Sequence, residues 1–277
     1  MHHNATPLGH TQRVPTHGFL TGPHPRAFVH RGWHSPTPGD PMHGMENSLS
    51  AFKLAVAEGY RYLETDVHAT SDGVVVVHHD ERLDRTTDAT GAVAALPWSV
   101  VRRARIAGRE TVVRLEELLE ELPEAYFNID CKSDAAVEPL LAVLARTVAA
   151  DRVCVASFSE ARLARVRRLA GPDVLTSMGM RAMVMFWASG RLPALPLGRS
   201  PGRPPIAQVP VRQGALTVVD PRLVAAARRR GGEVHVWTID EAEEMRRLLD
   251  LGVDGLMTDR PRVLKDVLVE RGLWARA

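Results

Sequence analysis

Short apolar segments that alternate with helical patterns are the feature that most restricts the fold of this chain. Eight such segments predict strands, and most are followed by apolar residues at helical spacing; they span residues 27–30, 61–66, 126–130, 153–156, 173–177, 206–209, 234–238 and 254–258. Strict strand–helix alternation calls for a parallel sheet, and eight units in one domain favour a (β/α)₈ barrel. A doubly wound open sheet is the alternative, although no Gly-x-Gly-x-x-Gly follows a strand to support nucleotide binding.

Length and composition agree with one large domain. The chain has 277 residues, of which 45% are hydrophobic, and this is enough to fill a real core. We expect residues 1–25, which are rich in His, Pro, Gly and Thr, to form a loose arm, and residues 26–277 to form a single barrel domain. The net charge of +2 and the lack of a nucleic-acid-binding motif argue against DNA or RNA as a partner.

The sequence also gives expectations about compartment. The N-terminal residues contain no apolar signal region, and no run of about 18 apolar residues is present, so we expect no membrane span and a cytoplasmic protein. The two cysteines, Cys131 and Cys154, lie in or beside predicted strands. We expect them to be small buried residues and not a disulfide.

Residues Tyr62–Asp80 read as two strands joined at the turn dipeptide Asp72-Gly73. Side chains alternate along a strand, so Glu64 and Asp66 should point to the same face. A turn centred on Asp72-Gly73 places Asp66 opposite His79, give or take one residue for a bulge. Two neighbouring carboxylates repel without a cation, which indicates a metal. A hairpin with an ordinary solvated polar face is the alternative for this segment alone.

Two further segments carry local predictions. A helix is expected to begin near residue 49, with Asn47 or Ser48 as its N-terminal cap. Residues 178–213 are the least regular part, with many Met, Leu and aromatic residues interrupted by Gly and Pro. We expect this segment to pack as a long loop over the core, and a lid or lipid-facing loop is the alternative.

Polar residues end nearly every predicted strand. They are His30, Arg31, Glu64, Asp66, Asp130, Lys132, Ser157, Trp237, Thr238, Thr258 and Asp259. The carboxyl ends of the strands meet at one face of a parallel barrel, and active sites form there. We therefore expect these side chains to line a single pocket.

The residue types in this pocket indicate a chemistry. Three carboxylates, from Glu64, Asp66 and Asp130, offer oxygen ligands that suit Mg²⁺ or Ca²⁺ better than Zn²⁺. Arg31 and Lys132 supply positive charge for a phosphate. Two histidines that do not bind the metal can act as general base and general acid. Together these groups favour phosphodiester hydrolysis.

A series of short motifs supports the same conclusion. In chain order they are His30-Arg31-Gly32, Glu46-Asn47-Ser48, Glu64-Thr65-Asp66, His79-Asp80 with Leu83-Asp84-Arg85-Thr86-Thr87, Asn128-Ile129-Asp130-Cys131-Lys132, Val236-Trp237-Thr238 and 252–261. Over residues 26–270 this ordered series resembles the glycerophosphodiester phosphodiesterase family.

The resemblance implies a TIM barrel with a small hairpin or insertion at its C-terminal face and one divalent cation, Mg²⁺ or Ca²⁺. The matching residues would be metal ligands (Glu64, Asp66 and Asp130), an acid–base pair (His30 and His79), phosphate contacts (Arg31 and Lys132) and pocket residues (Glu46 and Trp237). The family's His-Asp pair selects His79 over the adjacent His78. The expected substrates are small glycerophosphodiesters, and the expected products are glycerol 3-phosphate and an alcohol.

The chain departs from the family pattern in two places. The loop between His30 and Glu46 is longer than usual and carries His34 and His43, which could add a metal or substrate contact. The family more often has Glu at the position of Asp130. Asp is seen there in the related spider sphingomyelinase D group.

Two other functions stay open at this point. One is a lysophospholipase D, whose substrate would carry an acyl tail packed against Met183, Phe186 and Trp187. The other is a barrel that binds phosphodiesters without turnover.

Overall fold

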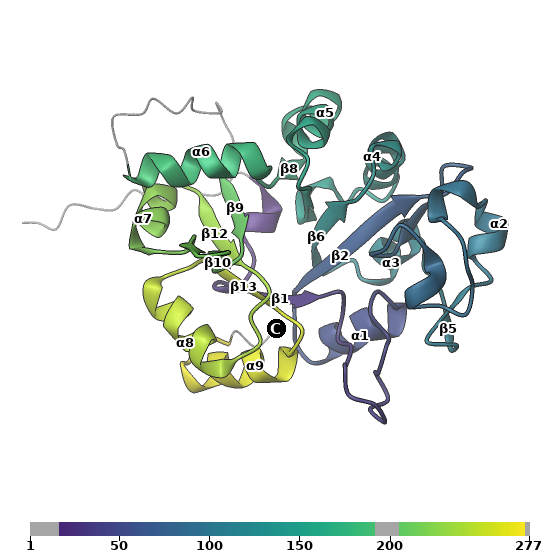
Figure 1. The fold of residues 1–277 in the computed structure, drawn as a ribbon, viewed down its shortest axis with the longest axis horizontal. Helices are drawn as coiled ribbons and strands as arrows, with labels where there is room; N and C mark the ends of the chain where they lie inside the picture. The colour runs from purple at the N-terminus through teal and green to yellow at the C-terminus, as the bar shows by residue number, and fades with distance from the viewer. Residues whose placement is uncertain (1–16, 192–204, 275–277) are drawn as a thin grey trace, which may run out of the picture.

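The computed structural model describes residues 17–191 and 205–274, and its centre is a parallel sheet (Figure 1). All eight predicted strands are present: β1 (Arg26–His30), β2 (Tyr62–Ala69), β6 (Tyr126–Cys131), β7 (Val153–Ala156), β8 (Leu175–Thr176), β9 (Ile206–Val209), β12 (Glu233–Val236) and β13 (Gly255–Thr258). Strand β8 is shorter than predicted, because residues Gly171–Asp173 form a 3-10 turn that contains Pro172.

The sheet closes almost completely into a barrel. The strand order is β8-β7-β6-β2-β1-β13-β12-β9, so strands that follow one another in the chain are neighbours all the way round. Between the outer strands β8 and β9, the backbone N–H of Met178 donates to the carbonyl of Ile206 at 2.9 Å. The predicted (β/α)₈ barrel is therefore confirmed, and the doubly wound alternative is wrong because its strand order would reverse at a switch point.

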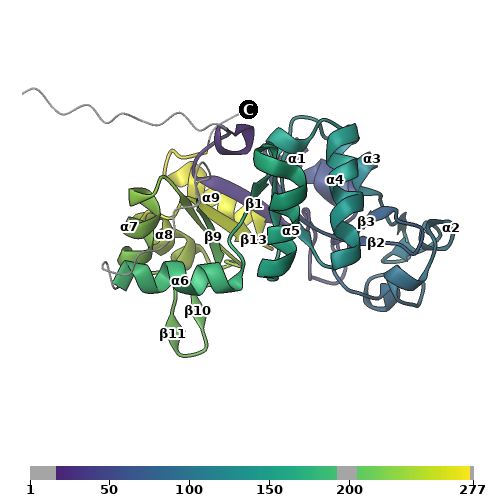
Figure 2. The ribbon, with the colours of Figure 1, turned by 90° about the horizontal axis from the view of Figure 1, so that it is seen from above.

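Helices surround this sheet (Figures 1 and 2). They are α1 (Leu49–Ala57), α3 (Leu115–Glu121), α4 (Val137–Arg146), α5 (Glu160–Ala170), α6 (Met180–Arg191), α7 (Pro221–Arg229), α8 (Ala242–Leu251) and α9 (Pro261–Glu270). Helix α1 begins with Ser48 as its cap, because the Ser48 hydroxyl accepts a hydrogen bond from the N–H of Ala51.

Helix α6 corrects the prediction for residues 178–213, which expected a long irregular loop. Met183 and Phe186 turn towards the core, while Met180, Val184 and Met185 are exposed on the other side. Apolar residues on both sides weaken the periodic signal of a helix. Residues 192–204 of the same segment lie outside the described residues.

Two additions extend the C-terminal face of the barrel. After β2 the chain returns through the antiparallel strand β3 (Val75–Val77) and enters an insertion that contains α2 (Trp98–Val101), β4 (Arg105–Ile106) and β5 (Glu110–Thr111). The second addition is the hairpin of β10 (Arg212–Gln213) and β11 (Leu216–Thr217), which projects below α6 in Figure 2. The small hairpin or insertion expected at this face is thus present twice.

The described part of the N-terminal arm is not loose. Residues Gly18–Leu20 form a 3-10 turn, and Phe19 is buried with its ring edge-on to Tyr62 at 5.3 Å between centroids. Phe19 packs in a cluster with Phe28 and Ile206, which gives the arm an apolar anchor that its polar composition hides.

Other expectations concern the cysteines and the membrane. Cys131 and Cys154 are buried and free, as predicted. Within residues 17–191 and 205–274, no helix is long and apolar enough to cross a membrane.

An ion pair links β1 to β12 across the intervening strand β13. Arg26, whose side chain is 2% exposed, donates two hydrogen bonds of 2.6 Å to Glu233. His235 donates a third, of 2.8 Å, to the same carboxylate. Burial alone would raise the pKa of Glu233, but these hydrogen bonds outweigh burial and lower the pKa to about 2.

Replacing Glu233 by Gln should destabilise the barrel by about 3 kcal/mol at neutral pH, because lowering a carboxyl pKa from 4.5 to about 2 corresponds to that much folding free energy. The folded pKa lies below the unfolded one, so the stabilisation is complete above about pH 4.5 and is lost as the pH falls towards 2. Urea denaturation at several pH values measures this difference, and wild type and Glu233→Gln should converge in acid. Glu120→Gln, at an exposed position of α3, is the control, and equal stability of wild type and Glu233→Gln at pH 7 would contradict the prediction.

Candidate active site

A cavity of about 460 Å³ opens at the carboxyl ends of the strands. Eight of the nine predicted site residues line it: His30, Arg31, Glu64, Asp66, His79, Asp130, Lys132 and Trp237. Residues far apart in the chain meet here because parallel strands all end at the same face. Their individual roles stay predictions.

Three carboxylates form one side of the cavity. Glu64 and Asp66 lie two residues apart on β2 and so share one face of the strand. The strand register places Asp130 on β6 beside Asp66. Their exposed fractions are 4%, 1% and 9%, so all three are desolvated. The ammonium of Lys132 lies between two of them, 2.8 Å from Asp66 Oδ1 and 2.7 Å from Asp130 Oδ2.

The electrostatics of the carboxylates differ. Burial, together with the charge of Asp66, raises the pKa of Glu64, and burial also raises the pKa of Asp130. Burial acts in the same direction on Asp66, but Lys132 and Arg31 outweigh it and lower the pKa of Asp66. Lys132 and Arg31 therefore stabilise the negative charge of Asp66, whereas charge on Glu64 and Asp130 is disfavoured unless a further cation is present.

This donor set fits a hard divalent cation by its chemistry, since three desolvated carboxylates offer oxygen ligands and two of them have raised pKa values. In the described parts of the chain, however, no three His, Cys, Asp or Glu side chains are gathered closely enough to form a ready metal site. The ammonium of Lys132 lies between Asp66 and Asp130 and pairs with one oxygen of each.

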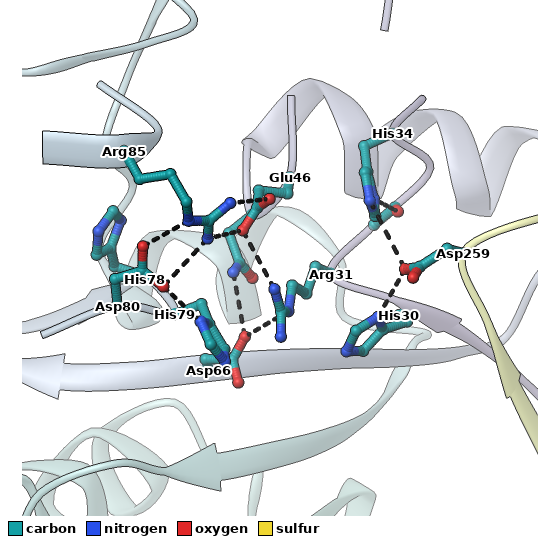
Figure 3. A network of polar contacts seen from close by, with 12 residues as sticks. His30, Arg31, His34, Glu46, Asp66, His78, His79, Asp80, Arg85 and Asp259 are labelled. Carbon is teal, nitrogen blue, oxygen red and sulfur yellow. Dashed lines mark hydrogen bonds and ion pairs between the residues drawn. The ribbon is translucent and has the colours of Figure 1, made fainter. Parts of the chain in front are cut away.

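His30 is held by a carboxylate from the neighbouring strand. Its Nδ1 donates a 2.6 Å hydrogen bond to Asp259, which follows β13 (Figure 3). Its Nε2 lies 3.8 Å from Glu64 Oε2. Burial lowers the pKa of His30, but Glu64 and Asp259 outweigh burial, so the pKa is raised. Asp259 was predicted at a strand end, but its partner could not be predicted from the sequence.

His79 has a comparable arrangement. Its Nδ1 donates a 2.6 Å hydrogen bond to the adjacent Asp80. The pairing of β2 with β3 places Asp66 opposite His78, whose backbone N–H donates to the Asp66 carbonyl. The register therefore differs by one residue from the predicted pairing of Asp66 with His79, within the allowance made for a bulge. The imidazole of His78 donates to the Arg82 carbonyl at 3.0 Å, whereas His79 lines the cavity.

Arg31 and Asn47 both contact Asp66. Arg31 Nε lies 3.2 Å from Asp66 Oδ2, and its backbone N–H donates to Glu64 Oε2 at 3.2 Å. Asn47 donates to Asp66 Oδ2 at 3.2 Å and accepts a hydrogen bond from the Thr65 hydroxyl at 2.9 Å. Sequence reasoning gave Asn47 only a possible capping role, although the Glu46-Asn47-Ser48 motif was a signal that it belonged to the site.

Glu46 is the predicted site residue that does not line the cavity. It lies behind Arg31, where it accepts a 3.3 Å hydrogen bond from the Arg31 guanidinium and two more, of 2.8 and 2.7 Å, from Arg85 (Figure 3). Glu46 therefore supports a cavity residue and does not line the cavity itself, and its predicted role as a pocket residue stays a prediction.

The two extra histidines have different surroundings. His34 donates from Nδ1 to the Gly32 carbonyl at 3.0 Å, and its Nε2 lies 3.6 Å from Asp259 (Figure 3). His43 is exposed on the loop and is absent from the cavity lining. Of these two histidines, His34 is therefore the one that lies close to Asp259, the partner of His30.

The opposite side of the cavity is apolar. Residues of α6 and of the segments around it and around the β10–β11 hairpin form most of this side, and Phe158 and Trp237 complete it. The lining residues are Met178, Met180, Met183, Val184, Trp187, Pro210, Leu216, Val218, Phe158 and Trp237. Phe158 and Trp237 meet edge-to-face at 5.8 Å between ring centroids. Phe186, which was expected in this wall, instead packs in the core.

Comparisons with known proteins agree on one family. Residues 30–263 match the model of the Glycerophosphoryl diester phosphodiesterase family. The chain is 41% identical over 267 residues to the Probable glycerophosphodiester phosphodiesterase 2 of Mycobacterium tuberculosis, which covers 94% of this chain and 97% of that protein. It is 25% identical to the Lysophospholipase D GDPD1 of Mus musculus, with 81% and 82% covered.

Solved structures show the same fold. A putative glycerophosphoryl diester phosphodiesterase from Silicibacter pomeroyi superposes with a TM-score of 0.74 at 26% identity, covering 94% of this chain and 100% of that one. A phosphodiesterase from Oleispira antarctica, in complex with the product sn-glycerol-3-phosphate, superposes with a TM-score of 0.69 at 19% identity, covering 89% and 97%.

Proposed function

The chain belongs to the glycerophosphoryl diester phosphodiesterase family, and from that premise we propose that it hydrolyses glycerophosphodiesters with a divalent cation, using His30 and His79 as its acid–base pair. The observation that supports this most directly is the composition of one cavity. Two imidazoles, each with a carboxylate on Nδ1, accompany three buried carboxylates and two cationic side chains there.

The two hydrogen bonds on Nδ1 define what the imidazoles can do. A carboxylate accepts, so Nδ1 of both His30 and His79 carries the proton and Nε2 is left for proton transfer. One imidazole takes a proton from water or from a neighbouring substrate hydroxyl, and the other protonates the leaving alcohol. The products are glycerol 3-phosphate and an alcohol, and the Oleispira antarctica phosphodiesterase was solved with sn-glycerol-3-phosphate as its product.

Glu64, Asp66 and Asp130 are the residues that would hold Mg²⁺ or Ca²⁺, since all three are buried carboxylates in the cavity. When bound, such an ion offsets negative charge that builds up on the phosphoryl oxygens. Arg31 and Lys132 add positive charge to the same region and would contact the phosphate. Trp237 forms part of the cavity wall beside Phe158. The expected cytoplasmic location stays a prediction.

A lysophospholipase D activity is the second candidate, and one observation favours it. Met183 and Trp187 do line the cavity, within an apolar wall that also includes Met180, Val184 and Leu216. Such a wall could hold an acyl tail. A barrel without turnover has no comparable support, because the family and its curated relatives are enzymes.

Alanine in place of His30 or His79 should each lower kcat on glycerophosphocholine by at least about 100-fold, because general acid–base catalysis contributes roughly that much or more. Circular dichroism should show that both variants remain folded. His43→Ala, on the exposed loop, is the matched control and should keep the wild-type rate. Near-normal turnover in either variant would refute the pair.

Removal of divalent cations should abolish the hydrolysis of glycerophosphocholine, since three buried carboxylates then repel the phosphate. A chelator titration, followed by addition of Mg²⁺ or Ca²⁺ in excess, measures the loss and its recovery. Lithium or sodium chloride at equal ionic strength controls for screening. Full activity in a chelated sample shown by elemental analysis to be free of metal would contradict the cation requirement.

The two candidate substrates can be separated at the apolar wall. Leu216→Asp places a charge in this wall, so it should raise KM for lysophosphatidylcholine at least tenfold and leave glycerophosphocholine nearly unchanged. Steady-state kinetics below the critical micelle concentration measures both. Thr217→Asp, next to it on β11 and absent from the cavity lining, is the control. Equal effects on the two substrates, or no turnover of the lysophospholipid by wild type, would remove this candidate.

A further inference from the structure

Arg85 makes polar contacts that the proposed chemistry does not account for. It ends the 3-10 turn Leu83–Arg85 in the insertion, is absent from the cavity lining, and its side chain is 50% exposed. Its guanidinium nevertheless donates four hydrogen bonds to two carboxylates. Two of them, of 2.6 and 3.1 Å, reach Asp80, and two, of 2.8 and 2.7 Å, reach Glu46.

Each of these carboxylates holds a cavity residue on its other side. Asp80 accepts the hydrogen bond from His79 Nδ1, and Glu46 accepts one from the Arg31 guanidinium. Figure 3 shows the resulting chain of contacts, which runs from His79 through Asp80, Arg85 and Glu46 to Arg31. The insertion is thereby connected to an imidazole and to a guanidinium that both face the cavity.

The charge states in this series of contacts depend on Arg85, its central member. Hydrogen bonds from Arg85 lower the pKa of Asp80. Burial raises the pKa of Glu46, but Arg85 and Arg31 outweigh it, so that pKa is lowered too. Both groups are therefore ionised at neutral pH and would repel each other if Arg85 were removed. A planar guanidinium bonds two carboxylates in fixed directions, which a lysine ammonium cannot do.

We infer that Arg85 is a positioning residue, which fixes His79 and Arg31 relative to each other so that both face the same phosphoryl group. The inference rests on the proposed function, because it concerns how the acid–base and phosphate-binding groups of that reaction are held. Arg85 itself does not line the cavity. A purely structural role, in which Arg85 only anchors the insertion, is the alternative.

Steady-state kinetics of Arg85→Ala and Arg85→Lys on glycerophosphocholine test the inference. Residues that orient active groups from behind typically contribute 10- to 100-fold, so kcat of Arg85→Ala should fall by about that factor, and KM should rise because Arg31 loses its support. Arg85→Lys should recover little of this activity, since lysine restores the positive charge but not the planar guanidinium that bonds two carboxylates at once. Arg82→Ala, which removes an exposed pair with Asp84 in the same insertion, is the matched control and should behave as wild type.

The single carboxylate variants divide the effect. Asp80→Asn should lower kcat with little change in KM, and Glu46→Gln should raise KM with a smaller change in kcat. The double variant Asp80→Asn/Arg85→Ala should be no worse in kcat than the poorer single variant, because both act through His79.

Chemical rescue distinguishes positioning from anchoring. Because Arg85 is half exposed, added guanidinium at concentrations far below denaturing ones can enter the gap left by Arg85→Ala. It should restore part of kcat in Arg85→Ala but none in His79→Ala. A kcat and KM of Arg85→Ala within twofold of wild type would overturn the inference. So would a loss of rate that follows unfolding in circular dichroism and that added guanidinium does not restore.

A measurement without turnover separates this inference from the proposed function. Nitrogen-15 NMR of labelled histidines reports which ring nitrogen of His79 carries the proton. Arg85→Ala should reduce the preference for a protonated Nδ1, and Arg82→Ala should not. If wild type hydrolyses no diester but this shift is seen, the proposed function fails and the positioning role stands; an unchanged His79 signal overturns the positioning role.

Discussion

The buried carboxylate of Asp66 is the constraint around which the site is arranged. Its side chain is 2% exposed, and an unpaired charge at that depth would cost several kcal/mol. Three side chains offset this cost: Lys132 after β6, Arg31 after β1 and Asn47 before α1. Because each comes from a different element, the charge of Asp66 can be accommodated only when these elements stand side by side. The stabilisation of the Asp66 charge thus requires the strand order that the barrel has.

The two imidazoles are held by different parts of the fold. The partner of His30 is Asp259, which lies at the end of β13, and the register that aligns β1 with β13 brings the two together. The partner of His79 is its neighbour Asp80, and this pair depends on the insertion, because Asp80 is bonded by Arg85. One imidazole is therefore as rigid as the barrel, whereas the other is only as rigid as the contacts of the insertion.

Much of the fold could be predicted because each strand is a short apolar run, and the polar residues that follow it mark its carboxyl end. The eight strands and the meeting of Glu64, Asp66 and Asp130 in one cavity follow from that pattern. Helix α6 could not be predicted, because apolar residues on both of its sides conceal the helical period. It is buried on one side by the barrel and lines the cavity mouth with the other.

The direction in which individual side chains point could not be predicted from the sequence. Glu46 was placed at the site by its motif, yet whether it faces the cavity or supports Arg31 from behind depends on the path of the loop before α1. Asn47 has a positive φ of 61°, a conformation that Asn tolerates better than most residues, and this turns its amide towards Asp66 while Ser48 caps the helix. The contact of Arg85 with Glu46 spans 39 residues of chain, and no local pattern encodes it.

The cavity has a charged side at the strand ends and an apolar side at α6 and the β10–β11 hairpin, and this division separates chemistry from selectivity. The charged side is built from the ends of β1, β2 and β6, whose positions are fixed by backbone hydrogen bonds along the sheet. The apolar wall comes mainly from α6 and the β10–β11 hairpin, and neither contributes a strand to the barrel sheet. Changes in these segments can reshape the apolar wall without moving a carboxylate or an imidazole, since loops on a rigid scaffold vary more freely than the scaffold. The apolar wall should therefore determine which diesters are accepted, through the group attached to the phosphate, while the residues at the strand ends determine which bond is broken.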